Sequence, residues 1–94
     1  MKNSGTVRRN YKAIVSDIAE GFLTINPLYL KPYEESALKS LYTALERKQV
    51  DIRAEPFPYH DTSLIRQRNL KLQRIFAAIT VMKSFSREKR FRLL

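Results

Sequence analysis

The sequence predicts an all-α protein of about three helices, arranged as a helical hairpin or an open bundle that a partner completes. Three observations predict it. Apolar residues recur every three or four positions in three separate segments, which is the period of one helical face. The four prolines and two glycines fall outside or at the edges of those segments. At 94 residues and 44% apolar composition, the chain forms one small domain with a modest core.

The first helix is expected over residues 9–22, where one face carries Tyr11, Ile14, Val15, Ile18 and Phe22. Gly21 is a suitable end, because glycine adopts the left-handed C-cap conformation without strain. The first acidic residue of the chain is Asp17, and it is preceded by the basic residues Lys2, Arg8, Arg9 and Lys12. A flexible basic N-terminus over residues 1–8 is the preferred interpretation, and a mitochondrial transit peptide is the alternative.

Residues 22–31 are interpreted as a packed loop, in which Pro27 turns the preceding residue away from helical geometry. The second helix is expected to begin near Pro32, since proline is favoured in the first helical turn. Val50 to Ile52 then leads into a Pro-rich linker over residues 53–60, which contains Pro56 and Pro58.

The third helix is expected over residues 61–90, with Asp61, Thr62 and Ser63 as candidate N-caps. A helix of about 25 residues is roughly 37 Å long. The two shorter helices cannot cover that length, so one end is expected to project or to contact a partner. The residues predicted to pack against partner helices are Leu38, Leu41, Leu45, Leu72, Ile75, Ile79 and Met82.

Charge is distributed unevenly along the chain, whose net charge is +9. Residues 64–94 contain nine basic residues and one acid, whereas residues 1–63 contain nine basic and eight acidic residues. A segment so rich in arginine and lysine is typical of surfaces that bind phosphates, anionic lipids or acidic proteins.

Two groups in this segment are candidate binding residues for nucleic acid or an acidic partner. The first is Arg66, Arg68, Lys71 and Arg74, and the second is Lys83, Arg87 and Arg90. Arginine can donate two hydrogen bonds to one phosphate or carboxylate. The apolar residues around the second group, which would suit stacking on single-stranded bases, are Phe85, Phe91, Leu93 and Leu94. A solvated basic face that aids solubility is the competing interpretation of the first group. Insertion into a partner groove or an anionic membrane surface is the competing interpretation of the second.

Nothing in the sequence indicates catalysis, and no cofactor is expected. There is no cysteine, and His60 is the only histidine, so the ligand set of a zinc site is missing. Asp61 beside His60 is better explained as a helix cap than as part of a general base. The lack of cysteine also favours a reducing intracellular location, nuclear in a eukaryote and otherwise cytoplasmic. No apolar run approaches the roughly 20 residues that a membrane span needs.

Two stretches resemble the N-terminal helical region of a GINS subunit, of the partner-of-Sld-five, number-one type. Residues 30–35, Leu-Lys-Pro-Tyr-Glu-Glu, are similar to the family's Leu-Pro-x-Tyr-x-Glu at the start of an amphipathic helix. Residues 63–69, Ser-Leu-Ile-Arg-Gln-Arg-Asn, resemble its Ser-Leu-Leu-Arg-Asn-Arg-Arg at the start of a long helix. The resemblance covers about residues 30–85. It implies a non-catalytic scaffold in a DNA-replication complex, with Arg66 and Arg68 buried or paired with carboxylates of a partner.

Three functions therefore stay open at this point. The first is a helical subunit of a macromolecular assembly, with replication as the specific expectation. The second is a nucleic-acid-binding protein that uses the basic C-terminal helix. The third is a protein that binds anionic membrane surfaces through the same helix, which is the least favoured of the three.

Overall fold

The computed structural model describes residues 9–91 and residue 93, and within them the fold is all-α, as predicted. The expected flexible segment, residues 1–8, lies outside the described residues. The described part contains four helices and no strand. The helices are α1 (Tyr11–Glu20), α2 (Pro27–Leu30), α3 (Glu35–Ala54) and α4 (Thr62–Lys89).

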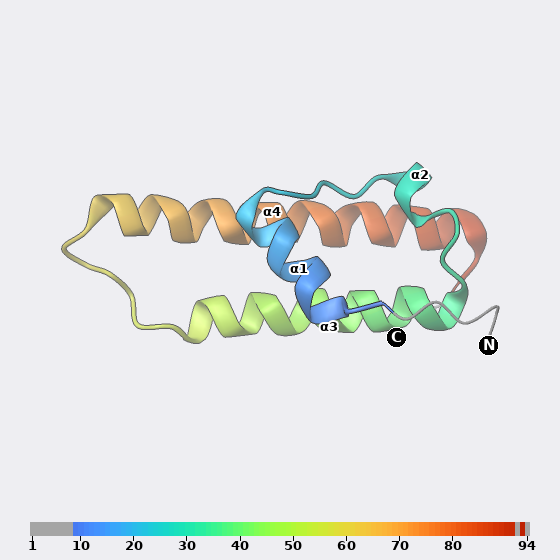
Figure 1. Ribbon diagram of the computed structural model, residues 1–94, viewed down its shortest axis with the longest axis horizontal. Helices are drawn as coiled ribbons and strands as arrows, with labels where there is room; N and C mark the ends of the chain where they lie inside the picture. Colours follow the sequence, from blue (N-terminus) through green and yellow to red (C-terminus); the bar gives the residue numbers. More distant parts are fainter. Residues whose placement is uncertain (1–8, 92, 94) are drawn as a thin grey trace.

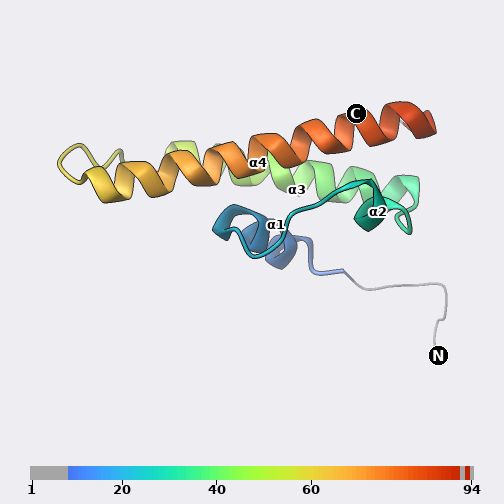
Figure 2. The same cartoon turned by 90° about the horizontal axis from the view of Figure 1, so that it is seen from above.

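The two long helices form an antiparallel hairpin, and the two short helices lie on one side of it (Figures 1 and 2). α1 packs against both α3 and α4, and α2 packs against α4. The core fills the space between these layers, and its fully buried side chains are Leu30, Leu38, Leu41, Leu45, Ile75 and Met82.

The ends of α1 follow from two residues. The Asn10 side chain accepts a hydrogen bond from the backbone N–H of Ala13, so the helix starts at Tyr11 and not at residue 9. Gly21 ends it in the left-handed conformation, with φ of 85°, as predicted. The periodic face points inward, and Val15 and Ile18 are buried.

The prediction of a loop over residues 22–31 is wrong in its second half, where the chain forms α2. The Asn26 side chain accepts a hydrogen bond from the backbone N–H of Tyr29 at 2.8 Å, and Pro27 occupies the first helical position. Asn26 is extended, as the residue before a proline should be, and that geometry suits an N-cap. Pro27 keeps Asn26 in an extended conformation, as expected, but this conformation allows Asn26 to cap a helix and does not prevent one.

The expected start of the second long helix at Pro32 is also wrong, because α3 begins at Glu35. Pro32 lies in a turn between α2 and α3, and the Tyr33 N–H donates to the Leu30 carbonyl oxygen at 2.9 Å. Glu34, with extended backbone, precedes the helix. At the other end, α3 continues through Val50 and Ile52 to Ala54, so the linker begins two residues later than predicted.

The boundaries predicted for α4 agree with the structure to within one residue. Asp61 is the N-cap, and its Oδ1 accepts a hydrogen bond from the Leu64 N–H at 3.0 Å. Arg90 ends the helix in the left-handed conformation, and its N–H reaches back to the Arg87 carbonyl oxygen. The 28 residues of α4 correspond to about 42 Å at 1.5 Å per residue.

The residues predicted to pack against partner helices instead pack within the chain. Leu38, Leu41, Leu45, Ile75, Ile79 and Met82 are buried in the core, and Leu72 is partly buried against it. The physical reason is the hairpin itself: the apolar stripes of α3 and α4 face each other and the underside of α1. These seven side chains stabilise the monomer, so a partner surface must be built from other residues.

Candidate partner interface

The first half of α4 is only partly covered by the rest of the chain. None of the side chains from Thr62 to Arg74 is buried, and Ile75 is the first that is. Figures 1 and 2 show that neither α1 nor α2 lies over the start of α4. The expectation that one end of this helix projects is confirmed for its N-terminal end.

The linker folds back on this end of the helix instead of running free. The rings of Phe57 and Tyr59 meet with centroids 4.8 Å apart, tilted by 57°. The Arg68 guanidinium lies over the Phe57 ring, with Cζ 5.1 Å from its centroid. The Pro-rich linker thus places the Phe57 ring against Arg68 in the second turn of α4, with the Tyr59 ring packed on Phe57.

Arg68 has a donor without an acceptor. Its Nε is buried and makes no hydrogen bond with any described residue. A buried N–H that lacks an acceptor costs about 1–3 kcal/mol, so such groups are rare unless something outside the chain completes them. A small cavity of about 160 Å³ adjoins this side chain, lined in part by Leu64, Gln67 and Lys71.

Large apolar side chains are exposed in the linker and in the first half of α4. Phe57, Tyr59, Leu64 and Leu70 are all exposed, and Tyr59 exposes 77% of its area. We call residues 55–74 the 55–74 segment: the linker together with the exposed half of α4. It combines exposed aromatic and aliphatic residues with arginine, which is the composition of protein–protein hot spots.

The four basic residues predicted as one binding group lie in different surroundings. Arg66 is exposed, whereas Arg68 lies on Phe57. Lys71 Nζ lies 3.4 Å from Glu20 Oε2, and Arg74 Nη1 donates to the Ala19 carbonyl oxygen at 3.0 Å. Their spacing spreads them around α4, so Lys71 and Arg74 face α1 while Arg66 faces away. The structure does not bring the four side chains to one anionic strand.

The second basic group is accessible, but its aromatic neighbours are not. Lys83, Arg87 and Arg90 are exposed. Phe85 is buried, and Phe91 and Leu93 are partly buried against the core; Leu94 lies outside the described residues. The expectation of rings free to stack on bases is therefore wrong for the described part, because the chain turns back after Arg90 and packs them inward.

The candidate general-base pair, His60 and Asp61, lies at the start of α4. Asp61 caps α4, as predicted, and His60 lies in the turn before it. No group of three potential metal ligands occurs in the described part of the chain. None of the described helices is both long and apolar enough to cross a membrane.

The sequence pattern placed Phe22 on the inward face of the first helix, Leu28 in a packed loop and Phe76 beside the apolar stripe of the long helix, and all three are wrong because these side chains are exposed. Sequence reasoning also missed Phe57 and Tyr59, which it treated only as linker. Two aromatic residues between and beside prolines were the available signal, because a stiff linker can hold rings in place. Comparison of the chain with family models, curated proteins and solved structures finds no match.

Proposed function

We propose that this chain is a non-catalytic helical subunit of an intracellular macromolecular assembly, which it joins through the 55–74 segment. The observation that carries the proposal is that the unsatisfied Arg68 Nε lies close to two exposed apolar side chains: the guanidinium is over the Phe57 ring, and Arg68 lines the same cavity as Leu64. A partner that covered Tyr59 and Leu70 would remove apolar area from water. An oxygen of that partner could accept the hydrogen bond that Arg68 Nε lacks.

The isolated chain gains little from this part of its sequence. The buried side chains of α4 all lie between Ile75 and Ser86. Leu72 packs against the core, but the exposed aromatic and aliphatic residues of the 55–74 segment contribute little to it. Exposed apolar side chains grouped in this way mark interaction sites more often than a solvated surface. The charged residues of the segment give it orientation and partner choice.

The specific assembly we propose is a GINS-like DNA-replication complex. The resemblance at residues 63–69 falls inside the 55–74 segment, so the likeness and the exposed surface coincide. In this proposal the chain acts as a scaffold. Its partners would be other helical subunits, and the outward end of α4 would be part of the contact.

A matched pair of variants tests this proposal. The double variant Tyr59→Ser/Leu70→Ser removes apolar surface from the 55–74 segment, and Leu28→Ser removes a side chain that is 77% exposed on α2. Circular dichroism and thermal melting first establish that both variants fold. Tagged proteins are then purified natively, washed with nuclease and with high salt, and their retained partners are identified by mass spectrometry.

We expect the wild type and Leu28→Ser to retain the same stoichiometric protein partners, and the double variant to lose them. Replication proteins among those partners would support the GINS-like assignment. Retention of the same partners by the folded double variant would refute the role of the 55–74 segment.

A second candidate function, nucleic-acid binding, is favoured by the free basic residues of α4. The helical period places Arg66, Lys83 and Arg87 on the same side of α4, and none forms an ion pair with a described residue. If these cations contact phosphates, log K should fall linearly with log salt, with a slope of about −0.7 to −0.9 per contact. Their triple glutamine variant should then reduce the slope by roughly 2–3, and an unchanged slope would exclude this use of α4.

A further inference from the structure

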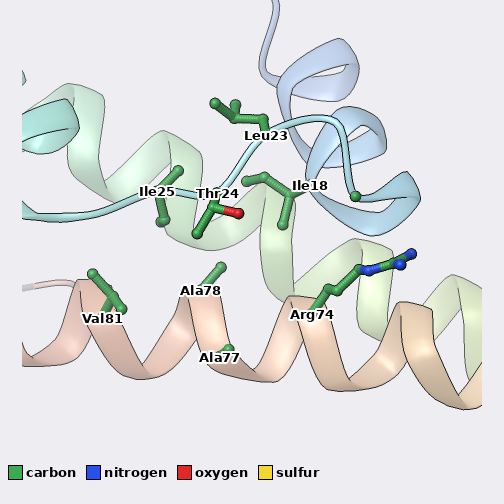
Figure 3. A pocket seen from close by; sticks show the side chains of 9 residues that line it. Ile18, Leu23, Thr24, Ile25, Arg74, Ala77, Ala78 and Val81 are labelled. Atoms are coloured by element: carbon green, nitrogen blue, oxygen red, sulfur yellow. The ribbon is translucent and has the colours of Figure 1, made fainter.

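A small apolar pocket lies between α4 and the connection from α1 to α2 (Figure 3). Its volume is about 220 Å³. Ala77 and Ala78 of α4 form one side, and Ile18 of α1 and Ile25 of the connection form the other, as the close-up shows. Arg74 lies at one end of this space.

The pocket exists because small residues meet where the connection crosses α4. Ala77 and Ala78 have short side chains that extend little from α4, and Gly21 has no side chain with which to fill the space. Three of the lining residues, Ile18, Ile25 and Ala78, are buried, so the walls belong to the core. Ala77 is exposed, which leaves the pocket open to solvent on that side.

Arg74 gives the pocket a charged end. Its Nη1 donates to the Ala19 carbonyl oxygen, which offsets the negative C-terminal end of α1. Its Nε and Nη2 have no acceptor among the described residues and stay available for a ligand. The nearby Glu20 carboxylate is paired with Lys71 at 3.4 Å. The charge of Arg74 is therefore left without an ion-pair partner among the described residues, and it lies beside an apolar cavity.

We propose that this pocket binds a small apolar monocarboxylate, with its chain over Ala77 and Ala78 and its carboxylate on Arg74. Guanidinium groups bind carboxylates through two parallel hydrogen bonds, and Nε and Nη2 present such a pair of donors. An apolar body matches walls made of alanine, isoleucine and valine side chains. The pocket shares only Arg74, the last residue of the 55–74 segment, with the proposed contact surface, and the proposal does not depend on that surface.

The volume limits the ligand. A water molecule occupies about 30 Å³ of liquid, so the pocket has room for roughly seven water-sized groups. That is less than the usual range of about 300–1,000 Å³ for drug-sized ligands. Hexanoate, with eight heavy atoms, is a suitable probe, and the neutral hexanamide has almost the same shape without the charge.

The test is a titration of the full chain with each probe, followed by NMR of methyl groups. We expect hexanoate to shift the methyl signals of Ile18, Ile25 and Ala78, and hexanamide to bind at least tenfold more weakly. The Arg74→Gln variant should bind hexanoate only as weakly as it binds hexanamide. Ala77→Leu should block both probes, because it fills the open side of the pocket without disturbing a buried residue. Ser84→Leu, an exposed α4 position away from the pocket, is the matched control and should bind like the wild type.

Three results would overturn the proposal. One is equal affinity for hexanoate and hexanamide, and another is binding that survives Ala77→Leu in a variant whose melting temperature shows it to be folded. The third is tighter, competitive binding of the capped dipeptide N-acetyl-Leu-Glu-amide, which would assign the pocket to a protein side chain instead of a free acid. The double variant that tests assembly changes no residue that lines the pocket, so the two proposals fail independently.

Discussion

The guanidinium of Arg74 occupies the space that a side chain at Gly21 would fill. A Cβ placed on Gly21 would lie 2.9 Å from Arg74 Cζ, and Gly21 also has a φ of 85°. The same arginine donates to the Ala19 carbonyl oxygen. A residue from α4 therefore completes the end of α1, 55 positions away in sequence, and it needs glycine there for two separate reasons.

Gly21→Ala should destabilise the protein for both reasons. The left-handed backbone costs a non-glycine residue about 1–2 kcal/mol, and displacement of Arg74 should add to that. Urea unfolding of Gly21→Ala, Arg74→Ala and the double variant separates the two effects. In the Arg74→Ala background the glycine substitution should cost only the backbone strain. Equal costs in both backgrounds would show that Arg74 moves aside freely.

Arg68→Met should leave the isolated chain nearly as stable as the wild type, within about 1 kcal/mol. The substitution removes a buried donor that lacks an acceptor, which is worth about 1–3 kcal/mol, and it loses a cation–π contact of about 0.5–2 kcal/mol. These changes oppose each other, and methionine retains much of the apolar stem. Chemical denaturation measures the difference. A loss above 2 kcal/mol would mean that Arg68 is a structural residue of the monomer.

Leu41→Ala should cost about 2–5 kcal/mol, because Leu41 is fully buried between the helices and its removal leaves a cavity. Leu28→Ala is the control, since Leu28 is 77% exposed and should change stability by no more than about 0.5 kcal/mol. Thermal unfolding followed by circular dichroism compares the two. Similar losses of stability in both variants would contradict the finding that the apolar face of α3, which includes Leu41, points into the core.

Stability should decline in alkaline solution through Tyr33. Burial and the hydrogen bond that its hydroxyl donates to Tyr29, at 3.1 Å, raise the pKa of Tyr33 well above the ordinary value of about 10. The folded state therefore holds this proton more tightly than the unfolded state. The stabilisation is complete below about pH 10 and is lost as the pH rises above it, when the unfolded phenol ionises.

The variant Tyr33→Phe keeps the ring under the Arg9 guanidinium, whose Cζ is 4.0 Å from the ring centroid, and removes the titrating group. Urea unfolding at pH 8 and above pH 10 should show a smaller alkaline loss in this variant than in the wild type. Burial also raises the pKa of Tyr42, so part of the loss should remain in both proteins. An identical loss in both would exclude Tyr33 as a source.

The helix periods and most caps could be predicted from sequence, because they depend on local chemistry. Gly21 and Asp61 act at helix ends as their types predict, and the α4 boundaries follow from Asp61 and from the absence of later prolines. The short α2 could not be predicted in this way. Its start depends on the Asn26 cap, and four residues give no apolar period to detect.

The candidate site was predicted less well, because the partners of each arginine come from distant segments. Lys71 and Arg74 are close to Arg66 in sequence, but α1 packs against their side of α4. Lys71 therefore faces Glu20, and Arg74 faces Ala19. The same limit applies to Leu45 and Ile75, which the apolar pattern marks as buried without saying by what. A single sequence indicates which side chains avoid water, and only the packing shows whether the chain covers them itself.

The absence of buried side chains before Ile75 gives α4 two ends of different character. Backbone amides from Ile75 to Ser86 should exchange hydrogen only when the whole domain unfolds, whereas those of the first three turns should exchange through local fraying. A partner that binds the outer turns must therefore order them and lose part of its binding energy in doing so. A mutation that stiffened only these turns would strengthen association without adding any contact, because the ordering would already be complete before the encounter.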